Sequence, residues 1–494
     1  MEKYDIIIIG SGLGGLQCGY ILSKKGYKVC VLEKNPQVGG CLQTFKRGQA
    51  LFDTGFHYIG GLDEGQSLHR LFRYFHLLDL PWHKMDENGY DEVIINGKSY
   101  YFASGHEQFV ETMASGFPGQ RKNLENYARF LRKVGDDIYH VFDKKGDKQK
   151  SFYGSLFSKS AYSYLKETID DPLLRNVLSG TALKMELHPA KLPLYTFAQI
   201  NESYTQSAWR IKGGGSQITD SLAGSIRSMG GNVLVGTEVT RMVEKNGEIR
   251  AVKLSNGEQI EGNRFISDIH PALTLELLHA VKTIRPSYRN RISALENTCG
   301  MSTINIKLKE NSVPYKNRNI HIHKDEDIWS YYNYIPGRKC PCVLVSYSVP
   351  EAGEHYARSI DLLTPMYWEE VEKWSDTKTG KRNEEYKMFK QQRAEECIDL
   401  ASEYIPELKT GIDHIFTGTP LTYQNYTGTV HGSAYGIRKD CNNLIYTIIS
   451  PKTPLSNLFL TGQNLTGHGI LGVSMTSLLT CAEIIGMDAV LEDF

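Results

Sequence analysis

The sequence predicts an α/β fold with a parallel sheet, and three neighbouring features of the N-terminal stretch indicate it. Residues 4–9 (YDIIII) form an apolar, β-branched run that stops at a glycine, as a buried parallel strand does. Residues 13–25 have the character of a helix, and Gly26 supplies a C-terminal stop. A second apolar run, 28–32, ends at Glu33. Strand, helix and strand in this order predict a βαβ unit.

The turn between the first strand and the helix carries G-x-G-x-x-G, made by Gly10, Gly12 and Gly15. The first glycine permits a tight turn, the second lets a pyrophosphate approach the backbone, and the third lets the helix pack on the strand. The motif alone is a weak signal in a chain with 46 glycines, and an ordinary glycine-rich turn is the alternative. Glu33 adds the carboxylate that accepts ribose hydroxyls and repels a 2′-phosphate. The unit therefore predicts a Rossmann-type site for FAD or NAD.

The residues after Glu33 distinguish between these two cofactors. From Gly39 to His57 the chain reads G-G-x-x-x-T-x-x-x-G-x-x-x-x-D-x-G-x-H. Enzymes that use NAD have no need of a second glycine loop here. Flavoproteins with an extended FAD do need one, because the second phosphate and the ribityl chain also approach the backbone closely. The sequence therefore predicts FAD.

The same loop resembles a known family. Residues 39–61, GGCLQTFKRGQALFDTGFHYIGG, resemble the retinol saturase branch of the phytoene desaturase and carotenoid isomerase flavoproteins. The part from Asp53 to Gly60 is specific to that branch, because carotenoid isomerases lack the His57-Tyr58 pair. The stretches AWRIKGGGSQI, GTPLTYQNYTGTVHGSAYG and SNLFLTGQNLTGHGILG extend the resemblance over almost the whole chain, with the weakest agreement between residues 85 and 185.

The resemblance implies a discontinuous Rossmann-type FAD-binding domain, as in amine oxidases and phytoene desaturases, with an inserted α+β substrate domain. The expected FAD-binding parts are residues 1–75, 206–270 and 451–494. The expected substrate domain comprises residues 76–205, mostly helical, and 271–450, a sheet plus helices. Among the individual elements, helices are expected over 67–78 and 216–228, and a hairpin around Asn96-Gly97.

Residues from all three FAD-binding parts are expected to contact the cofactor. Val239 is assigned to the strand beside the adenine, and a helix of about 473–485 is expected to meet the flavin ring with its N-terminus. Lys212 corresponds to a basic residue of the family and is expected near the flavin. The predicted cofactor-binding residues are Gly10, Gly12, Gly14, Gly15, Glu33, Lys34, Gly39, Gly40, Thr44, His57, Val239, Gly462, Gln463, Gly472 and Val473.

Retinol saturases reduce one double bond of a conjugated polyene, so the resemblance implies a lipophilic substrate of that class. Flavin N5 gives a hydride to one carbon, and an acid must protonate the other. His57 and Tyr58 are the predicted catalytic pair, with Tyr435 and His468 as further candidates. Three alternatives stay open: a carotenoid or phytoene desaturase, a redox-neutral polyene isomerase, and a non-catalytic lipid carrier like the prenyl-binding Rab GDP-dissociation inhibitors.

No second G-x-G-x-x-G follows a strand, so a dedicated NAD(P)H domain is not expected. The electron donor is then either NAD(P)H bound transiently in the substrate cleft or a separate protein. With 56 basic and 56 acidic residues the chain has no net charge, which argues against nucleic acid as a partner. Nothing in the sequence indicates an oligomeric state.

Nine scattered cysteines argue against a disulfide framework and for a reducing cytosol. The first strand begins at residue 4, which leaves no room for a signal peptide, and no run is long enough to span a membrane. Residues 151–166 mix aromatic and basic side chains and have three interpretations: a surface helix, a peripheral membrane patch through which substrate enters, or a nucleic-acid contact. His321 and His323 share one face of a predicted strand, but a third ligand is lacking, so a half-exposed sheet face is expected and no metal.

Overall fold

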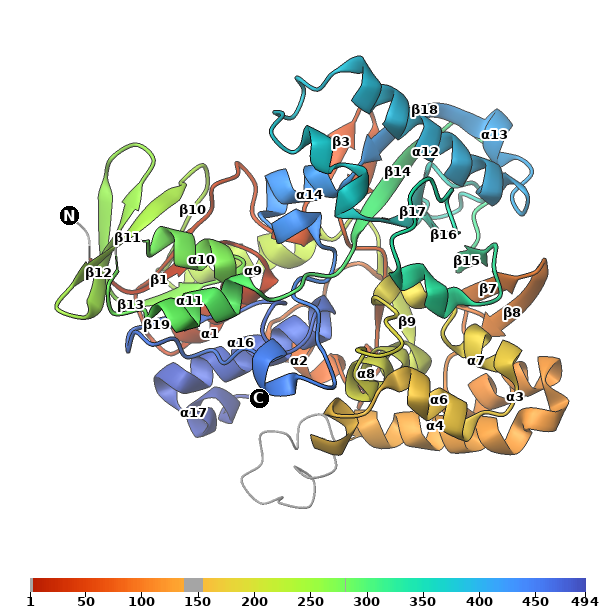
Figure 1. The fold of residues 1–494 in the computed structure, drawn as a ribbon, viewed down its shortest axis with the longest axis horizontal. Helices are drawn as coiled ribbons and strands as arrows, with labels where there is room; N and C mark the ends of the chain where they lie inside the picture. The colour runs from red at the N-terminus through yellow and green to blue at the C-terminus, as the bar shows by residue number, and fades with distance from the viewer. Residues whose placement is uncertain (1–2, 137–153, 280) are drawn as a thin grey trace.

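The computed structural model describes residues 3–136, 154–279 and 281–494, and one of its sheets is assembled from distant parts of the chain (Figure 1). The strand order is β10-β2-β1-β13-β12-β11, and β19 pairs with β13. The core strands β10, β2, β1, β13 and β19 are parallel, whereas β12 is antiparallel to β11 and β13. This sheet confirms the predicted α/β class. Its strands are β1 (Lys3–Ile9), β2 (Val29–Leu32), β10 (Asn232–Leu234), β11 (Val239–Lys245), β12 (Glu248–Leu254), β13 (Gln259–Ser267) and β19 (Leu458–Leu460).

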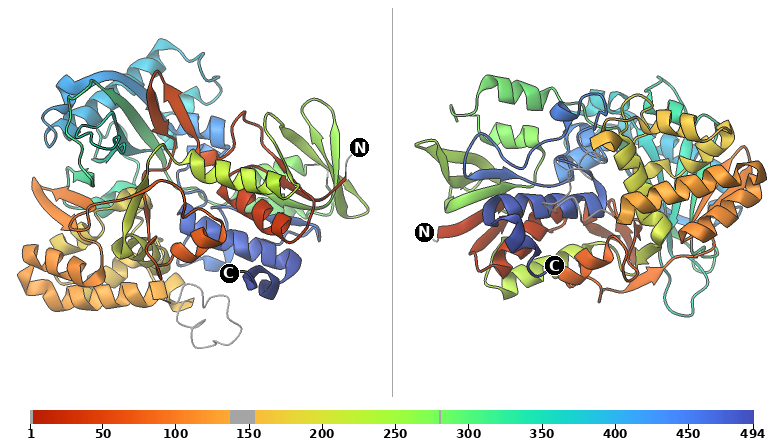
Figure 2. Two further views of the ribbon diagram at one scale, coloured as in Figure 1. Left: turned by 180° about the vertical axis from the view of Figure 1, so that it is seen from behind. Right: turned by 90° about the horizontal axis from the view of Figure 1, so that it is seen from below.

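Helices cover both faces of this sheet because its central strand is apolar on both sides. Ile6 and Ile8 of β1 pack into one buried cluster, and Ile7 and Ile9 pack into another. The first cluster takes in helices α1 (Leu13–Lys24), α9 (Ser216–Ser228) and α16 (Gly469–Ile485). The second takes in α10 (Pro271–Leu277) and α11 (Pro286–Ser293), on the other side of the sheet (Figure 2). The carboxyl ends of the parallel strands, where cofactors bind in such sheets, point to the middle of the molecule.

A second sheet lies across the middle of the molecule from the first (Figure 1). Its order is β18-β14-β17-β16-β15-β7-β8. Its two faces alternate along each strand: Leu362 of β17 packs under α12 (Glu384–Ser402), whereas Asp361 and Leu363 face the other way. The strands are β7 (Asp91–Ile95), β8 (Lys98–Phe102), β14 (Gly300–Leu308), β15 (Asn319–His323), β16 (Cys342–Tyr347), β17 (Ser359–Met366) and β18 (Ile412–Gly418).

A layer of helices packs against the second sheet at the lower right of Figure 1. It consists of α3 (His106–Gly116), α4 (Arg121–Asp136), α6 (Ala161–Thr168), α7 (Pro172–Leu178) and α8 (Leu194–Gln206). Smaller elements join the layers: the hairpin β3 (Thr44–Arg47) and β4 (Ala50–Asp53), the sheet of β5 (Ile59–Gly60), β9 (Ala208–Ile211) and β6 (Trp82–Lys84), and helices α2 (His69–Tyr74) and α14 (Pro420–Thr427).

Several predicted elements are confirmed, and two differ for local reasons. The helix at 216–228 and the hairpin around Asn96-Gly97 are as predicted. The helix expected over 67–78 is shorter, because His76 adopts a left-handed conformation (φ 53°) and the Leu77 N–H bonds back to the Phe72 carbonyl, which closes the helix end.

Helix α16 begins at Gly469, four residues before the predicted start at 473. The prediction placed both Gly469 and Gly472 before the helix, and glycine does disfavour helix interiors. Here the glycine is needed inside the helix, since a Cβ at Gly472 would lie 2.7 Å from the Gly467 carbonyl carbon.

The two histidines of NIHIH do not lie on a half-exposed face, so that expectation is wrong. His321 and His323 are both buried, because the sheet face that carries them is covered: the His323 ring, for example, stacks on Tyr331 with centroids 5.9 Å apart. The His323 Nε2 bonds the Gly180 carbonyl oxygen at 2.7 Å, and His321 lies 3.5 Å from Asp91. In the described ranges no three His, Cys, Asp or Glu side chains are grouped so that they could hold a metal ion.

The stretch 151–166 is described only from residue 154, and the basic residues just before it lie outside the described ranges. Of its aromatic side chains, Phe157 stacks on Tyr195 at 4.2 Å and Tyr162 packs against Trp329 at 5.1 Å. Lys159 forms an ion pair with Glu167. These contacts direct the aromatic rings inwards. No described helix has the length and apolar character that a membrane crossing needs.

Candidate active site

A cavity of about 960 Å³ runs from the glycine turn after β1 to the helical layer, between the two large sheets. Thirteen of the predicted cofactor-binding residues line it, together with both predicted catalytic residues. The exceptions are Gly15 and Thr44. Gly15 instead packs against the turn, and the Thr44 hydroxyl donates to the Ser216 hydroxyl at 3.1 Å.

The glycine turn has the close approaches that the motif predicts. Gly10 has a φ of +95°, which favours glycine. A Cβ at Gly15 would lie 2.3 Å from the Gly10 carbonyl oxygen, so only glycine lets α1 pack this close to the strand. Gly14 and Gly462 also approach closely, since a Cβ at Gly14 would lie 3.0 Å from the Gly462 nitrogen. This cradle of bare backbone at a helix N-terminus fits a pyrophosphate.

Glu33 lies at the end of β2 with only 6% of its surface exposed. Its Oε2 accepts hydrogen bonds from the Ser11 N–H at 3.1 Å and the Ser11 hydroxyl at 2.6 Å. Its Oε1 accepts from the Asn35 N–H at 2.8 Å. The carboxylate thereby ties the glycine turn to the end of the next strand. The neighbouring Lys34 also lines the cavity, and its Nζ donates to the Asn425 backbone carbonyl at 3.2 Å.

A second carboxyl group in the glycine turn was not predicted as a site residue. Asp268 follows β13 directly and accepts hydrogen bonds from the backbone N–H groups of Gly15 and Gly12. Burial raises the pKa of Asp268 to about 7 despite these bonds, and the nearby Glu33 adds to the rise. Asp268 therefore changes charge near neutral pH at the place where a pyrophosphate would bind.

Beside the glycine turn, the N-terminus of α16 and the segment before it form another wall. Gly462, Gln463, Gly472 and Val473 line the cavity there. The helix packs along α1, and its Ser474 hydroxyl accepts from the Gln17 Nε2 at 2.8 Å. Lys212 does not belong to this wall, contrary to expectation: it pairs with Glu351 and does not line the cavity.

His57 lines the cavity just after the second glycine loop. Burial lowers the pKa of His57 to about 4, and the positive charge of Arg210 contributes, so the imidazole is neutral at pH 7. Its Nδ1 lies 3.9 Å from the Asp361 carboxyl, whose pKa is itself raised to about 7 by burial. The buried Nε2 has no hydrogen-bond partner within the protein, which suits a contact with a bound group.

Tyr58 belongs to a buried polar cluster that the sequence did not predict. Its hydroxyl donates to Asp91 Oδ2 at 2.7 Å, and Lys184 Nζ lies 3.0 Å from the same oxygen. Asn319 donates to Asp91 Oδ1 at 3.0 Å. Burial raises the pKa of Asp91, but Lys184 and His321 outweigh this effect and hold the pKa well below its usual value.

Lys184 brings a positive charge to the wall of the cavity. Its Nζ lies 3.9 Å from the ring centroid of Tyr204 and 5.1 Å from that of Tyr58. Burial lowers the pKa of Lys184, and the ion pair with Asp91 opposes this shift. The pKa of Tyr58 is raised well above 10 by burial and by Asp91, so its phenol is protonated throughout the physiological range.

The backbone around Lys184 also holds the two other acid candidates. The His468 Nε2 bonds the Lys184 carbonyl oxygen at 3.0 Å, and the Tyr435 hydroxyl donates to the Leu183 carbonyl at 2.8 Å. Burial lowers the pKa of His468 to about 4 and raises that of Tyr435 well above 10. Both are therefore engaged in fixing one cavity wall to the C-terminal segment.

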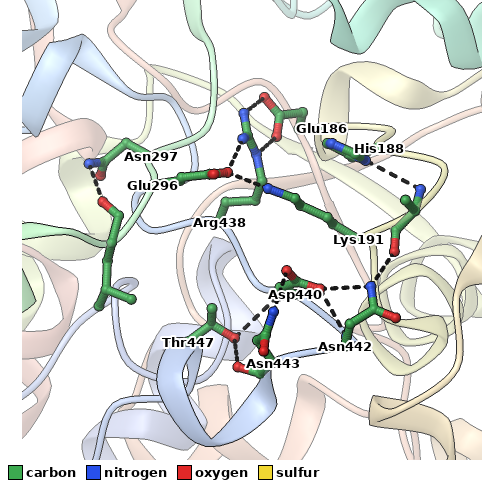
Figure 3. A network of polar contacts seen from close by, with 12 residues as sticks. Glu186, His188, Lys191, Glu296, Asn297, Arg438, Asp440, Asn442, Asn443 and Thr447 are labelled. Carbon is green, nitrogen blue, oxygen red and sulfur yellow. Dashed lines mark hydrogen bonds and ion pairs between the residues drawn. The ribbon is translucent and has the colours of Figure 1, made fainter. Parts of the chain in front are cut away.

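A network of ion pairs holds the segment with Leu183 and Lys184 in place (Figure 3). The Arg438 guanidinium bonds both carboxylate oxygens of Glu186 and also Glu296, which in turn accepts from Lys191 at 2.6 Å. Glu186 additionally accepts from the Cys299 N–H at 2.8 Å. The segment that carries Leu183 and Lys184 is thus tied to the start of β14 and to the C-terminal chain.

The fold and the site together define a flavoprotein of the oxidoreductase class. A family model described as flavin containing amine oxidoreductase matches residues 13–363. The chain therefore belongs to the flavin containing amine oxidoreductase family, and it is a flavin-dependent oxidoreductase whose predicted FAD is supported.

Curated relatives confirm the predicted resemblance to retinol saturases. An all-trans-retinol 13,14-reductase from Danio rerio is 28% identical over 98% of this chain and 86% of the relative. A prolycopene isomerase from an Oncidium hybrid cultivar is 22% identical over 99% of this chain and 85% of that protein.

Solved structures agree with the fold. Cyclohexylamine oxidase from Brevibacterium oxydans has a TM-score of 0.62 at 16% identity, covering 98% of this chain and all of the other. A Rab GDI from Plasmodium falciparum has a TM-score of 0.54 at 14% identity, covering 98% of both chains.

Proposed function

We propose that this protein uses bound FAD to reduce a carbon–carbon double bond of a lipophilic conjugated polyene. The observation that carries the proposal is the continuity of the cavity, which leads from the glycine turn to a chamber walled by Met301, Leu344 and Leu363. An apolar chain can be held there only by burial, at about 25 cal/mol per Å². The activity for which the all-trans-retinol 13,14-reductases are named supports the same substrate class.

The residues for FAD are those of the prediction. Gly10, Gly12 and Gly14 would accept the pyrophosphate, Glu33 the ribose, and Gly39-Gly40 the second phosphate region. When bound, the flavin supplies the hydride. The unpartnered His57 Nε2 would contact the cofactor, and the neutral imidazole suits hydrogen bonding better than proton donation.

Tyr58 is the proposed proton donor to the second carbon, with His57 beside it. In this role the Tyr58 hydroxyl turns from Asp91 towards the substrate, and its proton forms the new C–H bond. The phenolate that remains would be stabilised by the Lys184 ammonium, 5.1 Å from the ring centroid. The ion pair with Asp91 holds the lysine in place and opposes the lowering of its pKa by burial.

The alternatives differ in the fate of the electrons. A prolycopene isomerase is among the relatives, so isomerisation is the second candidate, and desaturation is the reverse of the proposed direction. A lipid carrier would not need the complete glycine cradle seen here.

For the electron donor we propose NAD(P)H bound transiently in the cleft or a separate redox protein. Peripheral contact with a membrane, a cytoplasmic location and the division of the chain into five domain segments stay predictions.

The test is anaerobic reduction of the purified holoprotein followed by mixing with all-trans-retinol, prolycopene and a quinone in turn. The proposal expects rapid flavin reoxidation by a polyene, with a product two hydrogens heavier. Isomerised polyene with the flavin still reduced would support the isomerase, and reoxidation by quinone alone would support the desaturase. A protein that is colourless and does not bind added FAD would contradict enzymatic function altogether.

A further inference from the structure

One face of helix α8 forms a wall of the cavity. Tyr195, Gln199 and Ser203 line it at intervals of four residues, which places their side chains on one helix face, and Tyr204 follows directly and also lines the cavity. The two ends of this wall have different neighbours. Tyr204 packs on Tyr58 with ring centroids 4.5 Å apart, whereas Tyr195 stacks on Phe157.

Gln199 is the anomaly in this wall. It is 9% exposed, and neither its amide nitrogen nor its amide oxygen has a hydrogen-bond partner within the protein. A buried amide without partners costs free energy that a methionine or leucine at the same position would not cost. Most buried polar groups are paired, so an unpaired amide that lines a cavity indicates a ligand.

The place of Gln199 separates it from the cofactor end of the cavity. At 1.5 Å per residue, its backbone lies about 7.5 Å along the helix from Tyr204 and about 6 Å from Tyr195. The other unpartnered polar atoms of the cavity wall are His57 Nε2 and Ser433 Oγ, on separate segments. Gln199 therefore lies between Tyr204, which packs on the proposed proton donor Tyr58, and the Phe157 end, on a helix that carries none of the predicted cofactor-binding residues.

We infer that Gln199 binds a neutral hydrogen-bonding oxygen of the substrate, an alcohol or a carbonyl, and so selects oxygenated polyenes over hydrocarbons. This rests on the proposed function. An amide offers both a donor and an acceptor, which matches a hydroxyl group. A carboxylate would need a positive charge, but the cation that lines this region, Lys184, is already paired with Asp91.

The test compares two ligands on the oxidised holoenzyme. All-trans-retinol and its hydrocarbon analogue, with CH₃ in place of CH₂OH, are titrated while flavin absorbance and tryptophan fluorescence are followed. The wild-type protein binds retinol about 10-fold or more tightly than the hydrocarbon, because the hydrocarbon leaves the amide unpaired. Gln199→Met, which keeps the volume, loses this preference, and the hydrocarbon binds at least as well as before.

Thr196→Val is the matched control, since Thr196 lines the same cavity from the same helix, and it leaves the preference intact. Gln199→Met keeps its FAD and melts at or above the wild-type Tm, because an unpaired amide has been removed. Equal binding of both ligands by the wild type, or an unchanged preference for retinol in Gln199→Met, overturns the inference about Gln199 and leaves the proposed function standing. Binding of neither ligand, with no flavin reoxidation by polyenes, overturns the proposed function and this subsite with it.

Discussion

The Tyr58 hydroxyl and the Lys184 ammonium converge on one carboxylate oxygen of Asp91, at 2.7 and 3.0 Å. Asp91 is fully buried, and the lysine side chain is 5% exposed. A phenol and an ammonium are thereby held side by side at the wall of a largely apolar cavity. This arrangement gives the proposed proton donor a positive neighbour that water does not screen.

Tyr58→Phe should keep FAD and lower the rate of flavin reoxidation by polyene about 10²–10⁴-fold, if Tyr58 is the general acid. Single-turnover stopped-flow absorbance measures the rate. Tyr204→Phe is the control, because that hydroxyl donates to the Tyr58 carbonyl oxygen and not to Asp91. An unchanged rate in Tyr58→Phe would remove the residue from the mechanism, whereas loss of FAD would show that it is structural.

His57→Gln should mainly weaken FAD binding, because the unpartnered His57 Nε2 is the group proposed to contact the cofactor.

Lys184→Met should destabilise the protein strongly, by about 3–5 kcal/mol, because it leaves the Asp91 carboxylate buried without a cation. Urea unfolding of the holoprotein measures the change. Lys159→Met is the control: it breaks a pair with Glu167 that is 38% and 58% exposed, and such pairs contribute at most about 1 kcal/mol. The double variant Lys184→Met with Asp91→Asn should recover part of the loss. Equal stability of the two single variants would contradict a buried ion pair.

FAD affinity should fall as the pH rises through about 7, because Asp268 then becomes ionised. When Asp268 is protonated, the backbone N–H groups at the helix N-terminus can bind the pyrophosphate. The ionised Asp268 carboxylate accepts hydrogen bonds from the same N–H groups and repels the phosphates. Since one proton is linked to binding, Kd should rise by at most about 10-fold per pH unit above the pKa. Fluorescence titration of apoprotein with FAD from pH 6 to 9 measures this. Asp268→Asn should give a flat profile, and a wild-type profile equally flat would refute the role of Asp268.

Two glycines of the cofactor domain make a matched pair. Gly15→Ala should abolish FAD binding, because its Cβ would lie 2.3 Å from the Gly10 carbonyl oxygen and push α1 from the strand. Gly224→Ala, inside α9, meets nothing within 4 Å and should raise stability by about 0.5–1 kcal/mol. Measurements of FAD content and of the melting temperature test both predictions. Retention of full FAD content by Gly15→Ala would show that the turn is looser than its geometry indicates.

The glycine turn could be predicted because its chemistry is local: Gly10, Gly15 and Glu33 lie within one βαβ unit. Asp268 could also have been found, since it follows a strand of the same parallel sheet, at the edge where Glu33 lies. The polar cluster of Tyr58, Asp91 and Lys184 could not. Its members lie 33 and 93 residues from Asp91 along the chain and meet only because β7 joins a sheet assembled from later strands.

The parallel sheet has a consequence for how the protein is made. β19 pairs with β13, and α16 packs along α1, which lies more than 440 residues earlier in the chain. During synthesis the first βαβ unit therefore leaves the ribosome long before its last strand and helix exist. Such distant pairings form slowly, and the early elements expose apolar surface until their partners have been synthesised. Translation speed and chaperones should thus affect the yield of this protein more than that of a flavoprotein whose cofactor domain is continuous in sequence.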